Sequence, residues 1–357
     1  MGELFEVAVS TVFFAVPDTV DDPERVSGGN VYDRRLRDGL EASGWDVRML
    51  PVPERTGALR RTLAGVPDDA LVLVDGLLVA RETGAVAAEA RRLRCAILTH
   101  MIDGELGDAE RADYYASRQV IATSAWTRAE LIAQDAAEPH AITVAHPGTD
   151  EFAPSSPSPS GGRLLCVGAV APHKGQDLLV EALSAFAGRP GWTCTVAGSL
   201  TTDPGFAAAL RERIDAAGLA DRVVLAGVLG GDALAEAYAR ADLVVQPSRL
   251  ESYGMAVADA LAHGIPVLVT EVGGLPEAIG VNDAAMIVPP DDPWAIRVVL
   301  QRWWASAEFR RALHDEALRA RGARRTWRSA VEAVAAALRR IESTDSHPAG
   351  ATRAAAS

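Results

Sequence analysis

Lysine is almost absent from this chain of 357 residues. Lys174 is the one lysine, and every other basic residue is an arginine. A single lysine in such a background suggests a position that needs a compact, rotatable point charge, as a contact with phosphate does. The alternative is a lysine left by chance on a solvated turn, and the surrounding sequence has to decide between the two.

An excess of positive charge is also absent. The formal net charge is −13, and residues 1–150 contain 15 arginines against 25 acidic residues, a balance near −10. Binding to nucleic acid or to an anionic membrane surface depends on an excess of Lys and Arg. The composition therefore argues against nucleic acid, against stable membrane association and against an anionic lipid acceptor.

Cysteines and long apolar runs are scarce as well. Cys95, Cys166 and Cys194 lie in separate strand-like runs without the spacing of a metal site, which predicts buried thiols in a reducing compartment. The apolar run at 7–16 is too short to span a bilayer and follows acidic residues where a signal peptide carries positive charge. The sequence therefore predicts a cytoplasmic protein.

Short apolar runs alternate with amphipathic helical stretches along the chain, as in parallel sheets covered by helices. In the first half we expect strands at 5–14, 46–50, 70–76, 94–100, 119–124 and 142–148. In the second half we expect them at 163–168, 192–198, 222–227, 243–248, 266–270 and 284–289. Between the halves, residues 153–162 are rich in Ser, Pro and Gly, which indicates a linker.

This pattern predicts an α/β protein with two doubly wound, Rossmann-like parallel-sheet domains that face each other across a cleft. The expected divisions are a first domain at 1–154, a linker at 155–162, a second domain at 163–325, a closing helix at 326–343 and a disordered tail at 344–357. Ligands of such sheets bind at the carboxyl ends of the strands.

Residues 247–279 carry the most specific signal. An apolar strand ends at Gln246, a short loop carries Glu251, and a helix opens near Gly254. Free amides and the dipole at a helix start attract anions. Asp259 lies a little over two turns beyond Glu251, and helical side chains lean back towards the N-terminus, so both carboxylates could serve one ligand.

A second strand-to-helix turn follows, in which Gly273 and Gly274 precede Glu277. It could help to build the same site, or it could be only a tight turn with a glutamate that stabilises the helix dipole. Among the histidines, His100 ends a strand of the first half, where a ligand is expected. His146 and His173 are weaker candidates for ligand contact.

Segments 167–183 and 247–279 resemble the donor half of the retaining glycosyltransferases of family 4, which have the GT-B fold. That family's pattern of two glutamates separated by seven residues corresponds here to Glu251 and Asp259. In the first half, residues 27–47 resemble the family's glycine loop and the helix after it, and His100 stands where the family often carries a histidine. The resemblance extends from about residue 5 to residue 342. It implies that the domain at 1–154 binds the acceptor, that the domain at 163–325 binds the nucleotide-sugar donor, and that the helix at 326–343 packs back on the first domain.

The resemblance implies a role for each of these residues. Lys174 would neutralise the donor diphosphate, Glu251 would contact the sugar hydroxyls, and Asp259 would bind the ribose. His100 would lie near the reacting sugar and complete a catalytic set with Lys174 and Glu251. The remaining donor-binding positions would be Gly28 and Gly29, as a loop closing from the other domain, and Ser252, Tyr253, Gly254, Met255 and Ala256, whose amides face the phosphates. Gly168, Gly273, Gly274 and Glu277 would support them.

Two positions depart from the family's pattern. Ala169 stands where the family usually has an arginine, so one of two cations expected at the diphosphate is missing. Asp259 stands where a glutamate is usual, which shortens the ribose contact by one methylene. Both departures suggest a weakened or unusual donor preference.

No Asp-x-Asp in a suitable context and no His/Asp/Glu cluster at metal-ligand spacing indicates a bound divalent ion, so we expect neither metal nor cofactor. The predicted function is transfer of a sugar, with retention, from a nucleotide diphosphate sugar to a hydroxyl of a small soluble acceptor, a UDP-sugar being the favoured donor. An epimerase or phosphorylase of the same fold and a non-catalytic partner protein are the alternatives. A dehydrogenase is disfavoured because no GxGxxG follows a strand.

Overall fold

The computed structural model describes residues 9–344, and the predicted tail lies almost wholly outside them. Its first sheet holds six parallel strands in the order β2-β1-β3-β4-β5-β6. These are β1 (Thr11–Pro17), β2 (Asp46–Val52), β3 (Leu71–Asp75), β4 (Arg94–Thr99), β5 (Gln119–Ala122) and β6 (Ile142–Val144). The first predicted strand starts later than expected, and its predicted beginning falls outside the described residues.

The second sheet also has six parallel strands, in the order β12-β11-β10-β7-β8-β9. They are β7 (Arg163–Val167), β8 (Thr193–Ala197), β9 (Val223–Gly227), β10 (Leu243–Gln246), β11 (Val267–Thr270) and β12 (Ala285–Val288). All residues of β3, β10 and β11 are buried, because helices cover both faces of each sheet. The prediction of two doubly wound α/β domains is confirmed.

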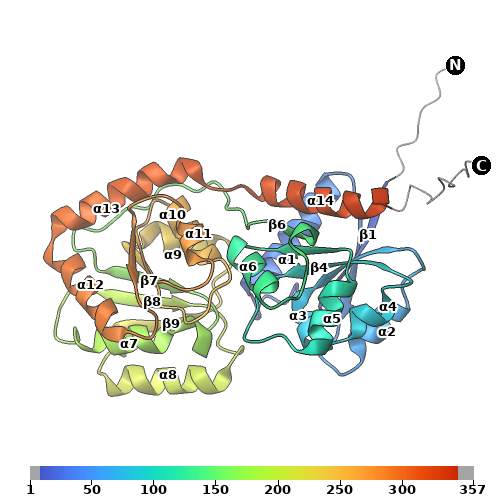
Figure 1. Ribbon diagram of the computed structural model, residues 1–357. Coiled ribbons are helices and arrows are strands. Elements are labelled where there is room, and N and C mark those ends of the chain that lie inside the picture. The colour runs from blue at the N-terminus through green and yellow to red at the C-terminus, as the bar shows by residue number, and fades with distance from the viewer. Residues whose placement is uncertain (1–8, 345–357) are drawn as a thin grey trace, which may run out of the picture.

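Helices connect the strands and cover the sheets (Figure 1). In the first domain they are α1 (Gly28–Ala42), α2 (Ala58–Ala64), α3 (Gly76–Arg81), α4 (Ala85–Glu89), α5 (Asp108–Ala116), α6 (Ala125–Ala133) and the 3-10 turn η1 (Pro139–Ala141). The second has η2 (Pro172–Lys174), α7 (Gln176–Ser184), α8 (Pro204–Ala216), α9 (Gly231–Arg240), α10 (Met255–Ala262), α11 (Leu275–Ile279), α12 (Pro293–Ala305), α13 (Ala307–Ala320) and η3 (Arg321–Ala323).

The last helix, α14 (Trp327–Thr344), returns to the first domain, where Val331, Val334 and Leu338 join a core with Leu36 and Leu40 of α1. Figure 1 shows α13 over the second domain and α14 over the first. The chain therefore crosses between the domains twice. The two crossings lie side by side, since the amide of Thr149 donates to the carbonyl of Arg325 at 2.9 Å.

The Ser/Pro-rich segment between the domains is bound to the second domain along its length. The carboxylate of Asp242, which is buried, accepts hydrogen bonds from the amide and hydroxyl of Ser158 and from the amide of Arg163. The amide of Ser155 donates to the carbonyl of His263. Composition alone suggests a free linker, but one buried aspartate holds this segment in place.

In both sheets the order of the strands reverses at one point, where ligands of doubly wound sheets bind. In the first sheet this point lies between β1 and β3, and in the second between β7 and β10. Lys174 follows β7 and Glu251 follows β10, whereas α1 follows β1 and Asp75 ends β3. The candidate residues of both domains are therefore placed at the two reversal points.

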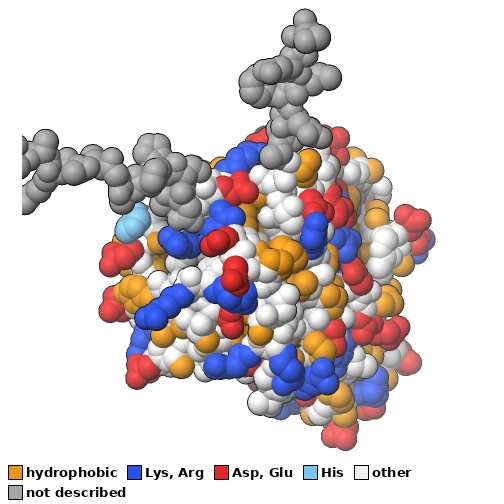
Figure 2. Space-filling view, turned by 90° about the vertical axis from the view of Figure 1, so that its right-hand side faces the viewer, with side chains coloured by type: hydrophobic (Ala, Val, Ile, Leu, Met, Phe, Trp, Pro, Cys, Tyr) orange, Lys and Arg blue, Asp and Glu red, His pale blue; other side chains and the backbone are white. Residues whose placement is uncertain are grey.

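Charges of both signs are interspersed on the face of the first domain that looks away from the second (Figure 2). Within residues 9–344, no helix combines the length and the apolar character needed to cross a bilayer. All three cysteines are buried free thiols, as predicted. Burial raises the pKa of Cys95 and of Cys166 to about 12, which keeps both protonated and unreactive at neutral pH.

Candidate active site

The site in the second domain centres on an ion pair between Lys174 and Glu251. The Nζ atom of Lys174 lies 2.6 Å from Oε2 of Glu251, and the side chains are 18% and 12% exposed. Lys174 ends η2, and the chain then turns at Gly175, where φ is +67° and a Cβ atom would lie 2.0 Å from the carbonyl oxygen of Pro247. Only glycine allows this approach, so Gly175 brings the lysine turn against the loop that carries Glu251.

The loop after β10 leads into the start of α10. Gly254 is the residue before α10, with φ of +101°, and not part of the helix's first turn. Within residues 9–344, the backbone amides of 252–256 have no hydrogen-bond partner. Unpaired amides at a helix start, together with the helix dipole, suit a phosphate.

The double glycine after β11 packs directly on this loop. A Cβ atom at Gly273 would lie 1.9 Å from the carbonyl oxygen of Glu251, and one at Gly274 would lie 2.1 Å from that of Ser252. The amide of Gly274 donates to the same carbonyl of Glu251 at 2.9 Å. The two glycines thus fix the backbone that presents Glu251. Gly168 adjoins the other partner, since its Cβ would lie 3.6 Å from Cδ of Lys174.

Asp259 lies on α10 and is partly exposed. Burial and the charge of Asp150 raise its pKa, while Arg35 lowers it, and the result is about 7. Arg35 and Asp150 form an ion pair on the first domain. Asp259 therefore faces the first domain and changes its charge close to neutral pH.

If Asp259 binds the ribose as a carboxylate, nucleotide affinity should rise by up to about tenfold between pH 6 and pH 8, the range in which a group with this pKa ionises. The neutral variant Asp259→Asn should remove this component of the pH dependence. Calorimetric titration of nucleotide at both pH values, with parent and variant compared at each, measures the effect. Identical pH profiles for the two proteins would refute the assignment.

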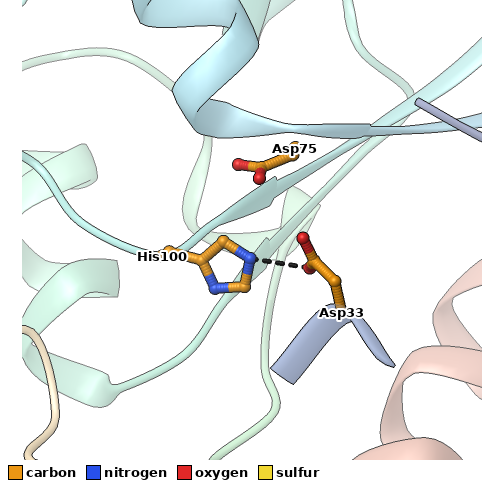
Figure 3. Close-up of side chains that lie close together, drawn as sticks. All are labelled: Asp33, Asp75 and His100. Atoms are coloured by element: carbon orange, nitrogen blue, oxygen red, sulfur yellow. Dashed lines mark hydrogen bonds and ion pairs between the residues drawn. The ribbon is translucent and has the colours of Figure 1, made fainter. Parts of the chain in front are cut away.

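The first domain contributes a cluster of three side chains from distant parts of the chain, Asp33 on α1, Asp75 at the end of β3 and His100 just after β4 (Figure 3). Nε2 of His100 lies 2.8 Å from Oδ1 of Asp33. Oδ1 of Asp75 accepts a hydrogen bond from the amide of Leu77. Asp33 and Asp75 are both buried.

The sequence gives no sign of this cluster, although its ligand-type atoms all lie within 4.8 Å of one another. It is the one group of three His, Cys, Asp or Glu side chains so close together in the described part of the chain. His100 and Asp33 are joined by a hydrogen bond, and Asp75 lies beside them, so we interpret the cluster as a charge network around the histidine.

Gly28 and Gly29 form the first turn of α1, so the loop predicted from the sequence is the start of a helix whose N-cap is Ser27. A Cβ atom at Gly28 would lie 3.5 Å from Sδ of Met255 in the second domain, and one at Gly29 would lie 3.3 Å from Cδ2 of His100. The two glycines thus stand between the histidine cluster and the start of α10.

Glu277 connects the two domains directly. From α11 it accepts hydrogen bonds from the amides of Ala125 and Trp126, one on each carboxylate oxygen and both at 2.7 Å. Nε2 of His146 lies 2.8 Å from Oε2 of Glu277. Glu277 therefore caps α6 of the first domain, a contact between domains that the sequence does not reveal. Tyr253 adjoins this contact, because its hydroxyl accepts from Arg325 and its ring lies beside that of His146.

The contact between the domains also shifts the pKa of Glu277. Burial raises it, but the hydrogen bonds from His146 and from the two amides outweigh burial, so the pKa is lowered. A carboxyl with a lowered pKa keeps its charge through neutral and mildly acidic pH. The contact is therefore lost only at a pH below the usual range of a glutamate.

Glu277→Gln should weaken domain closure, because an amide side chain can offer its one oxygen to only one of the two N–H groups. Loss of a charge-assisted hydrogen bond should lower kcat by about tenfold and increase the radius of gyration in small-angle X-ray scattering. His146→Ala removes one contact of the three and should have a smaller effect. A Glu277→Gln protein with the parent's scattering and turnover would contradict this.

The sequence of this chain is similar to those of known glycosyltransferases. Residues 149–319 match the family described as Glycosyl transferases group 1. A D-inositol 3-phosphate glycosyltransferase of Acidothermus cellulolyticus is 32% identical over 203 residues, which are 51% of this chain and 45% of that protein. A 2-deoxystreptamine N-acetyl-D-glucosaminyltransferase of Streptomyces fradiae is 35% identical over 157 residues, 43% of this chain and 36% of that protein. The matched part of this chain thus spans less than half the length of each of these two relatives.

Solved structures match over nearly the whole chain. Sucrose-phosphate synthase of Thermosynechococcus elongatus superimposes with a TM-score of 0.76 at 21% identity, over 94% of this chain and 100% of that one. Anabaena Alr3699/HepE in complex with UDP and glucose gives 0.72 at 17% identity, over 92% and 99%. The fold is therefore GT-B. The match to the glycosyl transferases group 1 model lies mainly in the second domain of this fold.

Proposed function

We propose that this protein is a retaining glycosyltransferase that moves a sugar from a nucleotide diphosphate sugar to a hydroxyl of a small soluble acceptor. The observation that carries the proposal is the set of groups gathered at the β7/β10 reversal point. There the ammonium of Lys174 pairs with Glu251, and the unpaired amides of 252–256 follow Glu251 directly in the chain. A diphosphate fits the donors, and sugar hydroxyls fit the carboxylate.

Two features favour a UDP-sugar and a small polar acceptor. Alr3699/HepE, whose fold this chain shares, has been solved with UDP and glucose. The relatives include glycosyltransferases named for D-inositol 3-phosphate and for 2-deoxystreptamine, which are small polar acceptors. The acidic first domain is also poorly suited to an anionic lipid acceptor.

The chemistry we propose needs no covalent intermediate on the protein. The bond between the anomeric carbon and the diphosphate oxygen breaks, the acceptor oxygen bonds to that carbon on the same face, and the leaving phosphate oxygen takes the acceptor's proton. Lys174 and the amides at α10 stabilise the negative charge that develops on the leaving group, and Glu251 orients the sugar. The same groups serve in place of a divalent ion, so we propose a metal-independent reaction.

A thermal-shift screen of UDP, GDP, ADP and dTDP and their sugars tests this function, followed by turnover assays in excess EDTA with candidate alcohols. We expect one nucleotide diphosphate to stabilise the fold and turnover to persist with chelator. Activity lost in EDTA and restored by magnesium or manganese would overturn metal independence. Turnover of nucleotide sugar without any alcohol would indicate an epimerase or phosphorylase, and binding without turnover would indicate a non-catalytic protein.

A further inference from the structure

Asp33 is held in an environment that ordinary helix packing does not explain. Asp33 is 0% exposed, although it lies in a stretch of α1 that is rich in charged residues. One carboxylate oxygen is hydrogen-bonded to His100, and the other, Oδ2, is buried without a hydrogen-bond partner among residues 9–344. A buried carboxylate destabilises the fold unless a positive charge compensates it. His100 is the group in position to carry that charge.

The other groups packed around His100 act in the same direction. Asp75 approaches from β3, and Tyr32 places its ring edge-on to the imidazole with centroids 5.4 Å apart. Burial lowers the pKa of His100, but the charges of Asp33 and Asp75 raise it by more, and the resulting pKa is about 9. Burial and the charge of Asp33 raise the pKa of Asp75 to about 7. At neutral pH the histidine is therefore cationic.

The glycine turn adjoins the edge of this cationic ring that carries Cδ2. Nδ1 of His100 points away from both carboxylates in Figure 3 and has no hydrogen-bond partner among the described residues. Gly29 adjoins the ring, and Gly28 adjoins Met255 at the start of α10. A ligand between the glycine turn and α10 therefore lies beside a ring that carries a positive charge.

We propose that Asp33 is a positioning residue that fixes His100 as an imidazolium, and that this imidazolium is the first domain's cation for the donor diphosphate. The inference rests on the proposed function. Lys174 alone does not balance a diphosphate, which carries at least two negative charges, because it is already paired with Glu251. Because His100 belongs to the first domain, it can neutralise the diphosphate only when α1 and α10 approach each other. Neutralisation of the donor's charge therefore depends on domain closure.

The first test measures the charge of His100 without any substrate. NMR titration of the imidazole signals, with His100 assigned from the spectrum of His100→Gln, should give a midpoint above pH 8. Asp33→Asn is nearly isosteric and should lower that midpoint by more than one pH unit. Asp113→Asn is the matched control, because Asp113 is equally buried in this domain but accepts hydrogen bonds from the amides of Gly84 and Ala87. It should leave the midpoint unchanged.

The second test is nucleotide binding, with UDP or whichever diphosphate the screen selects. At pH 7.5, Asp33→Asn should bind about tenfold more weakly than the parent, and Asp113→Asn should bind like the parent. At pH 5.5 the imidazole of Asp33→Asn is protonated again, so its affinity should return towards the parent's value at that pH. A merely structural role for Asp33 would not give this recovery.

The outcomes separate the inference from the function. A parent His100 that titrates near its ordinary pKa, or a stoichiometric divalent metal found on these three side chains, overturns the inference. Equal affinity of Asp33→Asn and parent at pH 7.5, once the variant's histidine is shown to be neutral, also overturns it and leaves the proposed function intact. A parent that binds no nucleotide diphosphate refutes the proposed function, while the titration still decides whether Asp33 charges His100.

Discussion

Lys174→Ala should lower kcat/KM by about tenfold to more than a hundredfold. A charge-assisted hydrogen bond is worth about 1.5–3 kcal/mol, and each 1.4 kcal/mol is a factor of ten. The structure adds a second reason, since the variant leaves Glu251 unpaired beside the incoming phosphates, where its charge repels them. Steady-state kinetics and calorimetric titration of nucleotide diphosphate measure the two effects, and the melting temperature verifies that the variant is folded.

Two companion variants sharpen the test of Lys174. Lys174→Arg keeps the charge but has a larger planar head group, so activity should recover only in part. A double variant, Ala169→Arg with Lys174→Ala, should regain some diphosphate affinity if position 169 faces the phosphates. Should Lys174→Ala bind and turn over like the parent, the one lysine would be an accident of a surface turn.

Glu251→Gln should lower kcat by about tenfold to a hundredfold, because a neutral amide holds the sugar hydroxyls less firmly than a carboxylate does. Nucleotide diphosphate should bind at least as tightly as to the parent, since loss of the ion pair releases the ammonium of Lys174. Opposite changes in turnover and affinity distinguish this role from a structural one. Binding of UDP weakened tenfold or more would show that the carboxylate serves the nucleotide instead.

The central strands of both sheets could be predicted because strands buried on both faces need unbroken apolar runs, as 71–74 and 243–245 show. The helix start after Glu251 could be predicted because Glu251, Gly254 and α10 are close in sequence. The ion pair between Glu251 and Lys174 joins residues 77 positions apart, and the sequence does not predict it.

The remaining parts of the site depend on contacts between distant segments. In the sequence, Asp33 stands next to two arginines and looks like a residue of a solvated helix face, and only the rotation of α1 on the sheet turns it towards His100. Glu277 reads as a residue of a helix's first turn, and its partners are amides of the other domain. A local sequence pattern therefore could not predict this contact between the two domains.

The scarcity of lysine makes the donor site chemically addressable. An amine-selective acylating reagent has one side-chain target in this chain, and that amine is 18% exposed within an ion pair. Its acylation rate therefore reports directly on whether the pair is closed, open or covered by ligand, without a purpose-built label. A lysine-specific endoproteinase likewise has a single cleavage site, after Lys174, at a tight turn that must unfold before it can be cut. Intact mass measured over time would thus follow both occupancy and local opening of the site in the unmodified sequence.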